Sequence, residues 1–277
     1  MMTYDLNQKV VLLTGSTGGL GRAIEQSLRA KGAKLALLDI DYQAAAEQAQ
    51  VLGDPGVVQA WQVDVRCSQS VETAIAAAAQ HFGGIDVVIA NAGIDVIASM
   101  ESMSPEAFDR VIDINLNGVW RTFRAALPHV CERKGYLLAI SSMAAFVHSP
   151  LQAHYTASKA GVWAMCNSIR LELRHQGVGV GSIHPTFFQT PLVSDLHASA
   201  AGRKLWGGNA KGIWKMVSLD EVVTETVRGI EQRADMVVIP RRNRFVARAP
   251  GLLRKLIERI GFDDTNVAES VRLANTN

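Results

Sequence analysis

Short apolar runs alternate with longer stretches of helical periodicity along most of the chain. The apolar runs, rich in valine, isoleucine and leucine, fall at Lys9–Thr14, Lys34–Asp39, Val57–Val63, Ile85–Ala90, Gly135–Ser141, Gly177–His184 and Met236–Ile239. Helical spacing is found between them, for example at Gly19–Lys31, Gln69–Phe82, Pro105–Val130 and Ala153–Gln176. Because strands that alternate with helices form βαβ units, the pattern predicts an α/β protein. Right-handed crossovers then favour a doubly wound parallel sheet of about seven strands with helices on both faces.

Two regions depart from this alternation. Residues 185–217 hold few regular signals but several aromatic side chains, and a loop of that length is typical of a lid or a substrate-binding loop. Basic residues gather after Pro240. Because no repeat, low-complexity segment or linker divides the preceding sequence, we expect one catalytic domain over residues 1–240, with a substrate loop at 185–217. Residues 241–277 then form a C-terminal extension.

Composition narrows the class of protein. The 277 residues are 48% hydrophobic and 19% charged, as in folded globular proteins, and a net charge of +2 does not favour nucleic-acid binding. Cys67, Cys131 and Cys166 lack metal-ligand spacing, so we expect three reduced, buried thiols, no metal and a cytoplasmic location. No apolar run reaches the ~18 residues of a membrane-spanning helix, and no signal peptide is expected before the first strand.

A glycine-rich segment follows the first apolar run. The sequence "TGSTGGLG", from Thr14 to Gly21, stands between the first expected strand and the first expected helix. Glycines at such a turn let the backbone approach a diphosphate, whose charge then meets the N-terminus of the helix. The spacing differs from G-x-G-x-x-G, and a tight turn without a ligand is the alternative. The segment predicts a Rossmann-like dinucleotide site.

An acidic residue closes the second expected strand. Asp39 follows Gly21 at a distance typical of the carboxylate that accepts hydrogen bonds from an adenosine ribose. The same carboxylate would repel a 2′-phosphate, and no Arg or Lys lies within residues 16–20. We therefore expect NAD as the cofactor in preference to NADP. A solvated aspartate at a strand end is the alternative.

Further motifs, in order, make the chain resemble a classical short-chain dehydrogenase/reductase from about Lys9 to Pro240. The motifs are Thr14–Gly21, Asp39, Asp64-Val65, Asn91-Ala92-Gly93, Asn115, Ser142 and Tyr155-x-x-x-Lys159. The resemblance implies a catalytic tetrad of Asn115, Ser142, Tyr155 and Lys159, in which Ser142 orients the substrate and Asn115 sustains a water relay. It also implies cofactor contacts from Gly15, Thr17, Gly19, Leu20, Gly21, Asp39, Asp64, Val65, Asn91, Ala92, Gly93, Tyr155, Lys159, Pro185, Phe188 and Thr190.

The chemistry of an alcohol–ketone couple fits this tetrad. Oxidation needs a base for the hydroxyl proton while the nicotinamide takes the hydride. An unperturbed tyrosine titrates near ~10, and bringing its pKa to ~7 requires about 4 kcal/mol of phenolate stabilisation. We expect the Lys159 ammonium to supply most of this stabilisation and the oxidised nicotinamide ring the remainder. The spacing of Tyr155 and Lys159 argues against the enoyl-reductase branch of the family.

The segments expected to meet the substrate are largely apolar. In "HPTFFQTPL", Pro185 and Thr190 match the family pattern, while Thr186 replaces a glycine and Phe188 stands where a small aliphatic residue is usual. Apolar and aromatic positions also dominate the segments after Gly93 and Ser142, which favours a lipophilic substrate such as a steroid, a terpenoid or a long-chain alcohol. The candidate substrate residues are Ile94, Met143, His148, Phe187 and Trp206; a solvent-facing His148 is the alternative for that residue.

The C-terminal extension begins with a basic amphipathic segment. Residues 241–260 hold seven Arg or Lys and one Glu, a net charge of +6 in a chain whose total is +2. An apolar helical stripe is expected at Leu252, Leu253, Leu256, Ile257 and Ile260. Such a segment either docks on its own or a neighbouring subunit or lies on an anionic membrane as a peripheral contact.

Three functions remain open. The first is an NAD-dependent alcohol/ketone oxidoreductase, the second an NAD-binding sensor or scaffold without turnover, and the third an isomerase or epimerase that returns the hydride. The complete tetrad favours an enzyme, because a protein without turnover has no chemical need for all four side chains. The resemblance also implies a homodimer or homotetramer assembled through the helices that carry Asn115 and Tyr155.

Overall fold

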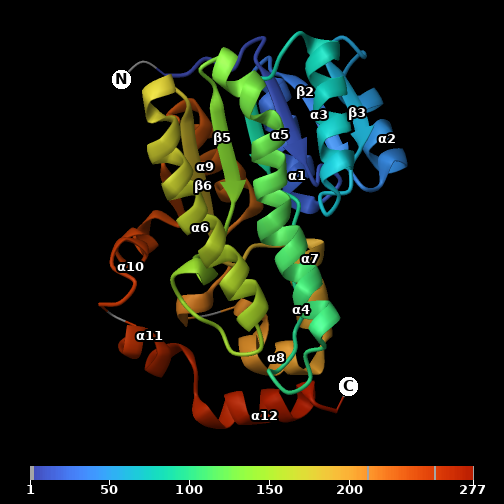
Figure 1. Cartoon of the computed structure of the whole chain (residues 1–277). Helices are drawn as coiled ribbons and strands as arrows, with labels where there is room; N and C mark the ends of the chain where they lie inside the picture. The colour runs from blue at the N-terminus through green and yellow to red at the C-terminus, as the bar shows by residue number, and fades with distance from the viewer. Residues whose placement is uncertain (1–2, 211, 253, 277) are drawn as a thin grey trace.

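The computed structural model describes residues 3–210, 212–252 and 254–276, and a parallel sheet forms its centre (Figure 1). The strands are β1 (Val10–Thr14), β2 (Lys34–Asp39), β3 (Val58–Gln62), β4 (Val87–Ala90), β5 (Tyr136–Ile140), β6 (Gly179–Pro185) and β7 (Met236–Ile239). They pair in the order β3-β2-β1-β4-β5-β6-β7, and every pair is parallel. The strand order reverses between β1 and β4, which places the expected ligand crevice at the carboxyl ends of these strands. The doubly wound fold is confirmed.

Helices cover both faces of the sheet. They are α1 (Gly19–Ala30), α2 (Tyr42–Leu52), α3 (Ser68–Phe82), α4 (Pro105–Ile112), α5 (Gly118–Glu132), α6 (Ala153–Leu173), α7 (Pro191–Ala198), α8 (Ala200–Trp206), α9 (Leu219–Glu231), α10 (Arg244–Arg248), α11 (Arg254–Gly261) and α12 (Asp264–Ala274). Buried residues of α1, α2 and α9 share one core with the sheet, and those of α3, α5 and α6 share the other. The two cores correspond to the two faces of a doubly wound sheet.

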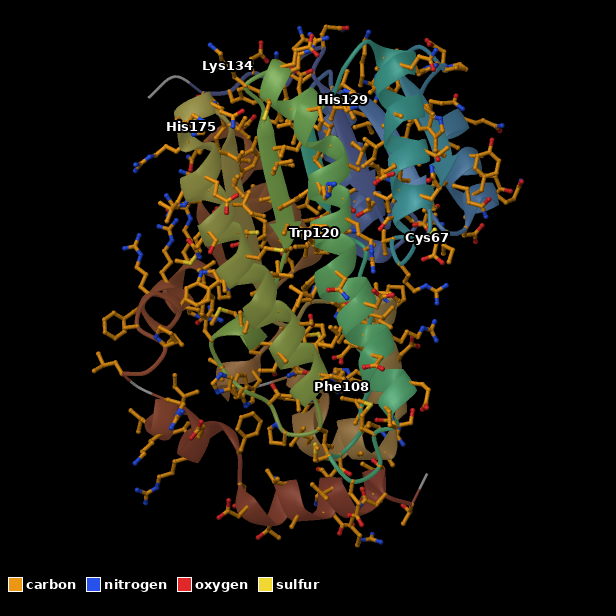
Figure 2. All side chains as sticks on the ribbon, in the orientation of Figure 1. Cys67, Phe108, Trp120, His129, Lys134 and His175 are labelled. Carbon is orange, nitrogen blue, oxygen red and sulfur yellow. The ribbon has the colours of Figure 1, made fainter. Side chains whose placement is uncertain are left out.

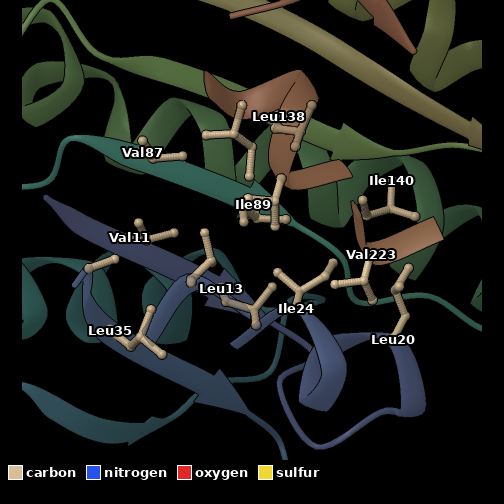
Figure 3. Packing of buried hydrophobic residues seen from close by; sticks show 14 of the residues in the cluster. Val11, Leu13, Leu20, Ile24, Leu35, Val87, Ile89, Leu138, Ile140 and Val223 are labelled. Atoms are coloured by element: carbon tan, nitrogen blue, oxygen red, sulfur yellow. The ribbon is translucent and has the colours of Figure 1, made fainter. Parts of the chain in front are cut away.

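Side chains alternate between these two cores along each central strand. In β1, Val11 and Leu13 belong to the core beneath α1 and α9, while Val10 and Leu12 belong to the opposite core. Figure 3 shows Val11 and Leu13 among side chains from the neighbouring strands and from α1. Because both faces of the sheet are covered, the strands read as continuous apolar runs. Burying each such side chain contributes roughly 1.5–3 kcal/mol.

The helix expected over Pro105–Val130 is interrupted. Ser104 caps α4 by accepting a hydrogen bond from the Ala107 N–H at 3.1 Å, and a single π-helical turn, Asp113–Asn117, joins α4 to α5. A π turn inserts one extra residue into a helix and re-aims the side chains around it. It carries Asn115, so the irregular turn coincides with a candidate catalytic residue.

Residues 185–217 contain more regular structure than expected. They form α7 and α8, with short 3₁₀ turns at Gly207–Asn209 and Gly212–Trp214. Thr190 caps α7 through the Val193 N–H at 3.3 Å, and Ser199 caps α8 through the Gly202 N–H at 2.9 Å. Capping residues favour helix starts even where hydrophobic periodicity is weak. The expectation of a largely irregular loop was wrong for this reason.

The C-terminal extension folds back on the catalytic part of the chain (Figure 1). Leu151, Ala201 of α8 and Ala274 of α12 form one buried cluster, against which Ile97 packs. The Trp214 indole N–H donates to the Gly261 carbonyl at the end of α11 over 2.9 Å. Within the described ranges, none of the helices combines the length and apolar character needed to cross a bilayer.

The thiols differ from the expectation of three buried groups. Cys166 is buried, Cys131 is partly buried and Cys67 is exposed at the start of α3 (Figure 2). Cys67 directly precedes the first turn of α3, in a connecting segment, and connecting segments run over the protein surface. All three are free thiols.

Candidate active site

A cavity of about 530 Å³ opens at the carboxyl ends of the central strands. Its wall includes most of the residues predicted to form the site, namely Gly15, Thr17, Gly19, Leu20, Asp39, Asp64, Val65, Asn91, Ala92, Gly93, Ile94, Ser142, Met143, Tyr155, Lys159, Pro185, Phe187, Phe188 and Thr190. Gly21, Asn115, His148 and Trp206 are not part of the wall. One continuous cavity therefore joins the candidate cofactor residues to the candidate catalytic residues.

The glycine-rich segment makes two close backbone approaches. Gly15 has a φ of +65°, and a Cβ there would lie 2.7 Å from the Ala92 Cα. A Cβ on Gly21 would lie 2.5 Å from the Gly15 carbonyl oxygen. A side chain at either position would displace the backbone, so Gly21 acts by letting α1 pack on the loop and not by lining the cavity.

The N-terminus of α1 faces the cavity through Gly19 and Leu20. The residue before the helix is Gly18, and no side chain caps the first turn. The N–H groups of a first helical turn have no partners within the helix, and they carry partial positive charge. This cradle fits the diphosphate of a dinucleotide.

Asp39 stands where β2 reaches the cavity. Its Oδ2 accepts hydrogen bonds from the N–H and the hydroxyl of Thr17, both at 2.9 Å, and its Oδ1 accepts from the Asp41 N–H at 3.2 Å. The side chain is 6% exposed, yet it forms part of the cavity wall. The carboxylate is thus held in place by the glycine-rich loop, in the position expected for a contact to a ribose.

Asp64 carries an ion pair that the sequence motif did not predict. The Arg66 guanidinium donates to both carboxylate oxygens of Asp64, at 2.7 Å in the shortest contact, and both side chains belong to the cavity wall. The hydrogen bonds from Arg66 hold the pKa of Asp64 below its usual value. Val65 is buried beside them. The planar guanidinium adds a cationic surface at the adenosine end of the cavity.

Asn91 joins two strand ends. Its side-chain amide donates to the carbonyls of Thr14 and Gly15 at 3.1 and 2.8 Å, and its backbone N–H donates to the Thr14 hydroxyl at 3.1 Å. Ala92 donates to the same hydroxyl at 3.3 Å. These hydrogen bonds make Asn91 a brace between the glycine-rich loop and the end of β4.

Asn115 is fully buried behind the cavity. From the π turn, its side chain exchanges two hydrogen bonds of 2.8 Å with the backbone of Ile94 and donates to the Ser158 hydroxyl at 3.2 Å. A Cβ on Gly93 would lie 3.3 Å from the Asn115 Oδ1 and 3.5 Å from the Lys159 Nζ. Asn115 therefore positions the backbone of Ile94 beside the lysine.

Tyr155 and Lys159 lie on one face of α6 and come together in the cavity. The Lys159 Nζ is 5.5 Å from the centre of the Tyr155 ring and donates to the Ile140 carbonyl at 2.9 Å. Burial lowers the pKa of Lys159 to about 8. Because that value remains above neutrality, the amine is still mostly protonated at pH 7, so its charge is available to the tyrosine.

The protein's own groups raise the pKa of Tyr155 instead of lowering it. Burial is the larger cause and the negative charge of Asp95 the second, while a hydrogen bond with the Ser142 side chain acts in the opposite direction. The expected stabilisation of the phenolate, most of it from Lys159 and the remainder from the oxidised nicotinamide ring, therefore stays a prediction for the protein with its cofactor bound. Desolvation of the buried phenolate outweighs the hydrogen bond with Ser142.

Ser142 follows β5 at the cavity wall. Its hydroxyl accepts a hydrogen bond from the Ala144 N–H at 3.1 Å, which fixes the short 3₁₀ turn Met143–Ala145. The neighbouring Ser141 is buried and donates to the Lys159 carbonyl at 2.9 Å. The Ser141 hydroxyl thus stabilises α6, whereas Ser142 lines the cavity.

The predicted substrate residues divide into two groups. Ile94, Met143 and Phe187 line the cavity, whereas His148 is exposed and faces a separate depression beside α11. Trp206 is only 4% exposed and lies behind Phe187, with 4.7 Å between the ring centres. Trp206 is thus kept out of the cavity wall by its packing behind Phe187, and His148 takes the solvent-facing alternative given for it.

Trp214 occupies the wall position expected for Trp206. Its indole ring packs edge-on against Trp206, with 5.5 Å between the ring centres, and it also contacts Phe262 at 5.2 Å. Phe262 lies between α11 and α12, far along the chain from the substrate loop. No local sequence pattern distinguishes the two tryptophans, since their places depend on contacts with the C-terminal extension.

Asp95 is a wall residue that the sequence motifs did not predict. Its carboxylate accepts hydrogen bonds from the Gln152 amide and the Val96 N–H and lies 3.2 Å from the His154 Nε2. Asp95, Gln152 and His154 are all buried or nearly so, and burial raises the pKa of Asp95. Gln152 and Asp95 flank Tyr155 in the wall. In the sequence, Asp95 closely follows the Asn91-Ala92-Gly93 motif and Gln152 closely precedes Tyr155, and this proximity was the signal that could have identified them.

The residues after β6 complete the wall. Pro185, Phe188 and Thr190 contribute to it, and Phe188 pairs through its backbone with Val217. Thr186, which replaces the usual glycine, donates its N–H to the Ile239 carbonyl at 2.9 Å. The substitution is therefore accommodated by strand pairing with the end of β7. The cavity as a whole can hold a dinucleotide and place its far end beside a proton-transfer group.

Comparisons with known proteins agree with this geometry. Residues 9–201 match the family model described as short chain dehydrogenase. The chain is 35% identical over 206 residues to a 3beta-hydroxysteroid dehydrogenase 1 from Eggerthella lenta, covering 73% of this chain and 79% of that protein. It is 32% identical over 193 residues to a D-beta-hydroxybutyrate dehydrogenase from Rhizobium meliloti, covering 67% and 73%. The structure of a 3-ketoacyl-(acyl-carrier-protein) reductase from Brucella melitensis complexed with NADH has a TM-score of 0.75 at 25% identity, over 84% of this chain and 97% of that one.

Proposed function

This chain belongs to the short-chain dehydrogenase/reductase family, and we propose that it uses NAD to interconvert a secondary alcohol and a ketone on an uncharged, lipophilic substrate. The family assignment makes it an oxidoreductase that acts on CH–OH groups with a nicotinamide cofactor. The observation that carries the finer proposal is the single cavity that runs from Asp39 to Tyr155, with apolar walls at its substrate end.

The position of Asp39 supports NAD. Its carboxylate is fixed by Thr17 at the adenosine end of the cavity, where a 2′-phosphate would bring a second negative charge against it. Ribose hydroxyls, in contrast, donate hydrogen bonds that a carboxylate accepts. Ile40, the next residue, is uncharged, and the guanidinium that lines the same wall, that of Arg66, is already paired with Asp64.

Tyr155 would transfer the proton. Nicotinamide, when bound, supplies the hydride acceptor or donor. In oxidation, the Tyr155 phenolate would accept the hydroxyl proton while the C–H bond of the alcohol breaks, and in reduction the protonated phenol would return a proton to the carbonyl oxygen. Ser142 would hold the substrate oxygen beside the phenol, and the Lys159 ammonium would stabilise the phenolate.

The charge environment favours the protonated phenol. Burial and the nearby Asp95 raise the pKa of Tyr155, so the protein by itself holds this group as an acid at neutral pH. A protonated tyrosine is the form that donates to a ketone.

Two features of the wall support an uncharged, lipophilic substrate of steroid, terpenoid or long-chain type. Ile94, Met143, Phe187 and Trp214 supply apolar surface, and burial of such surface is the main source of affinity for a lipophilic ligand. Asp95 adds a buried acidic group next to Tyr155, which disfavours a substrate carboxylate. A small anionic hydroxy acid is therefore a poorer fit than a neutral alcohol.

A substrate panel tests the proposal. The protein is assayed with NAD and with NADP against steroid, terpenoid and long-chain secondary alcohols and against 3-hydroxybutyrate, with NADH formation as the readout. We expect turnover with at least one neutral lipophilic alcohol and NAD. Preference for 3-hydroxybutyrate would contradict the substrate assignment alone. Cofactor binding without net turnover of any alcohol or ketone would instead favour a sensor or an isomerase.

A homo-oligomer through α4, α5 and α6 is part of the proposal. Phe108 of α4, Trp120 of α5 and Leu171 of α6 are large apolar residues that are 40%, 48% and 59% exposed. Figure 2 shows Phe108 and Trp120 on the outward sides of their helices. Apolar side chains at this density on the outer helices are typical of a subunit interface. Light scattering of the intact protein measures its mass and would contradict the assignment if it returned a monomer.

A further inference from the structure

The C-terminal extension presents an apolar stripe to solvent. Leu256 and Ile260 are 53% and 63% exposed and stand four residues apart in α11, which places them on one side of the helix, and Leu252 in the turn before α11 is 70% exposed. Phe245 on α10 is also exposed. Leu253, which was expected in the same stripe, lies outside the described residues. We refer to Phe245, Leu252, Leu256 and Ile260 as the tail stripe.

The body of the protein fixes α11 with this stripe turned outward. Ile257 is the apolar residue of α11 that faces inward, where it packs against the cluster of Phe146 and Trp163. The Gly261 carbonyl accepts the hydrogen bond from Trp214. Docking on the same subunit thus accounts for Ile257 but leaves the tail stripe uncovered.

Basic residues surround the tail stripe. Arg242, Arg244, Arg248, Lys255 and Arg259 are exposed, and in the described part of the chain no carboxylate lies within ion-pair distance of any of them. Two other cations of the segment are paired, Arg241 with Glu225 at 3.0 Å and Arg254 with Glu258 at 3.6 Å.

Glu258 is the single acid of residues 241–260, and it is partly buried. On the helix, Lys255 and Arg259 each directly precede a stripe residue, so cations border the apolar side chains. The exposed surface of α10 and α11 is therefore apolar along its centre and positive along its margin, and the exposed Asp263 and Asp264 lie beyond the C-terminal end of α11.

The positive charge around the tail stripe indicates what kind of partner this surface binds. A two-fold contact through this surface would bring two patches of the same positive charge together, which like-charge repulsion disfavours. An anionic bilayer attracts the basic margin and accepts the apolar side chains at the boundary of headgroups and acyl chains. We propose that the tail stripe and its basic margin dock this protein on an anionic phospholipid membrane as a peripheral contact.

The docking surface lies near the cavity. Trp214 forms part of the cavity wall and is bonded to the end of α11, so both features belong to the same end of the molecule (Figure 1). A membrane at α11 would hold the cavity close to a reservoir of lipophilic substrate. This last consequence rests on the proposed function, whereas membrane docking itself does not.

Vesicle sedimentation of the full chain tests the proposal. We expect the protein to pellet with vesicles of phosphatidylcholine and phosphatidylserine at low salt, at least about fivefold more than with phosphatidylcholine alone, and to be released by high salt. The readout does not depend on catalysis, so it is independent of the substrate assignment. A protein that stays in the supernatant, or that pellets equally with both vesicles, overturns the proposal.

Two variants separate the apolar and charged contributions. Leu256→Ser with Ile260→Ser, and Lys255→Gln with Arg259→Gln, should each lower the pelleted fraction roughly fivefold. Matched controls are Val51→Ser, which is 87% exposed on α2, and Arg174→Gln, which is exposed after α6; both should pellet as the parent protein does. Because all the changed residues are exposed, circular dichroism should show unaltered folding. If light scattering shows a dimer that Leu256→Ser with Ile260→Ser dissociates, without any effect on pelleting, a second copy occupies the surface and the proposal is wrong.

Discussion

The two ends of the cavity are built by different means. At the cofactor end, Gly15, Asp39 and Asn91 are fixed by hydrogen bonds that involve the backbone and short loops. At the substrate end, Phe187 and Trp214 are fixed by aromatic packing against Trp206 and Phe262. The first kind of contact depends on a few residue types at set positions, whereas the second depends on volume and shape. Sequence motifs can therefore predict the residues of the cofactor end. At the substrate end, the side chains can change while the fold is kept.

The largest effect on activity should come from Tyr155, which lies where the cofactor end and the substrate end of the cavity meet. Tyr155→Phe removes the phenolic oxygen and leaves the cofactor end intact, so we expect kcat to fall at least about 10³-fold because general acid–base catalysis is lost. NADH binding, measured by fluorescence titration, should stay within about twofold. Tyr42→Phe on the exposed start of α2 serves as the control and should leave kcat unchanged. A Tyr155→Phe enzyme with more than a few per cent of the parent kcat would show that proton transfer occurs elsewhere.

A change at Asp39 should alter the cofactor end alone. Asp39→Ser removes the charge that opposes a 2′-phosphate and leaves the Arg22 guanidinium, which donates to the Thr17 carbonyl at 2.9 Å, as a nearby cation. We expect the ratio of kcat/KM for NAD to that for NADP to fall roughly 10- to 100-fold, as for the loss of a hydrogen bond to a charged group. Asp41→Ser, which affects the cap of α2, should leave this ratio unchanged. A parent protein that already prefers NADP would refute the role of Asp39.

A change at Phe187 should alter the substrate end alone. Phe187→Ala removes one apolar wall and its contact with Trp206, so we expect KM for a lipophilic alcohol to rise about tenfold, the equivalent of part of one buried aromatic side chain. KM for NAD should stay within about twofold, and steady-state kinetics with each substrate varied in turn measures both. Equal increases in the two KM values would mean that the two ends are not independent.

The smallest effect concerns the stability of the fold. It tests whether the buried acidic side chain of α1 lowers the free energy of unfolding. Glu25 of α1 is 2% exposed, accepts a hydrogen bond from Gln48 at 2.7 Å, and has a pKa raised by burial from 4.5 to about 7. Because the folded protein holds this proton more tightly than the unfolded chain, stability should fall as pH rises from about 4.5 to 7 and stay lower above pH 7. Glu25→Gln should remove this loss and stabilise the protein at pH 8 by about 1–2 kcal/mol.

Urea unfolding at pH 5 and pH 8 measures the effect of Glu25→Gln. Glu47→Gln, an exposed carboxyl on α2, is the control and should show no such difference between the two pH values. If Glu25→Gln changes stability equally at both, ionisation of Glu25 is not the source of the loss.

Much of the cofactor end was predictable from the sequence because its determinants are local. The alternation of apolar runs and helical stretches predicted a doubly wound parallel sheet of about seven strands, since strands and helices impose their own periods of two and of 3.6 residues. Thr14–Gly21 and Asp39 lie at strand ends that a parallel sheet necessarily brings to one edge. Tyr155 and Lys159 share a helical face whatever surrounds them.

The tertiary structure alone decided which side chains surround the substrate and the tail. Asp95 meets His154 and Gln152 across almost sixty residues of sequence, and Trp214 meets Phe262 across a similar distance. Such contacts depend on how separate elements pack, and packing has no period that a linear pattern can display. For the same reason, the sequence identified the basic, amphipathic character of residues 241–260, but only the structure determined which side of α11 faces solvent.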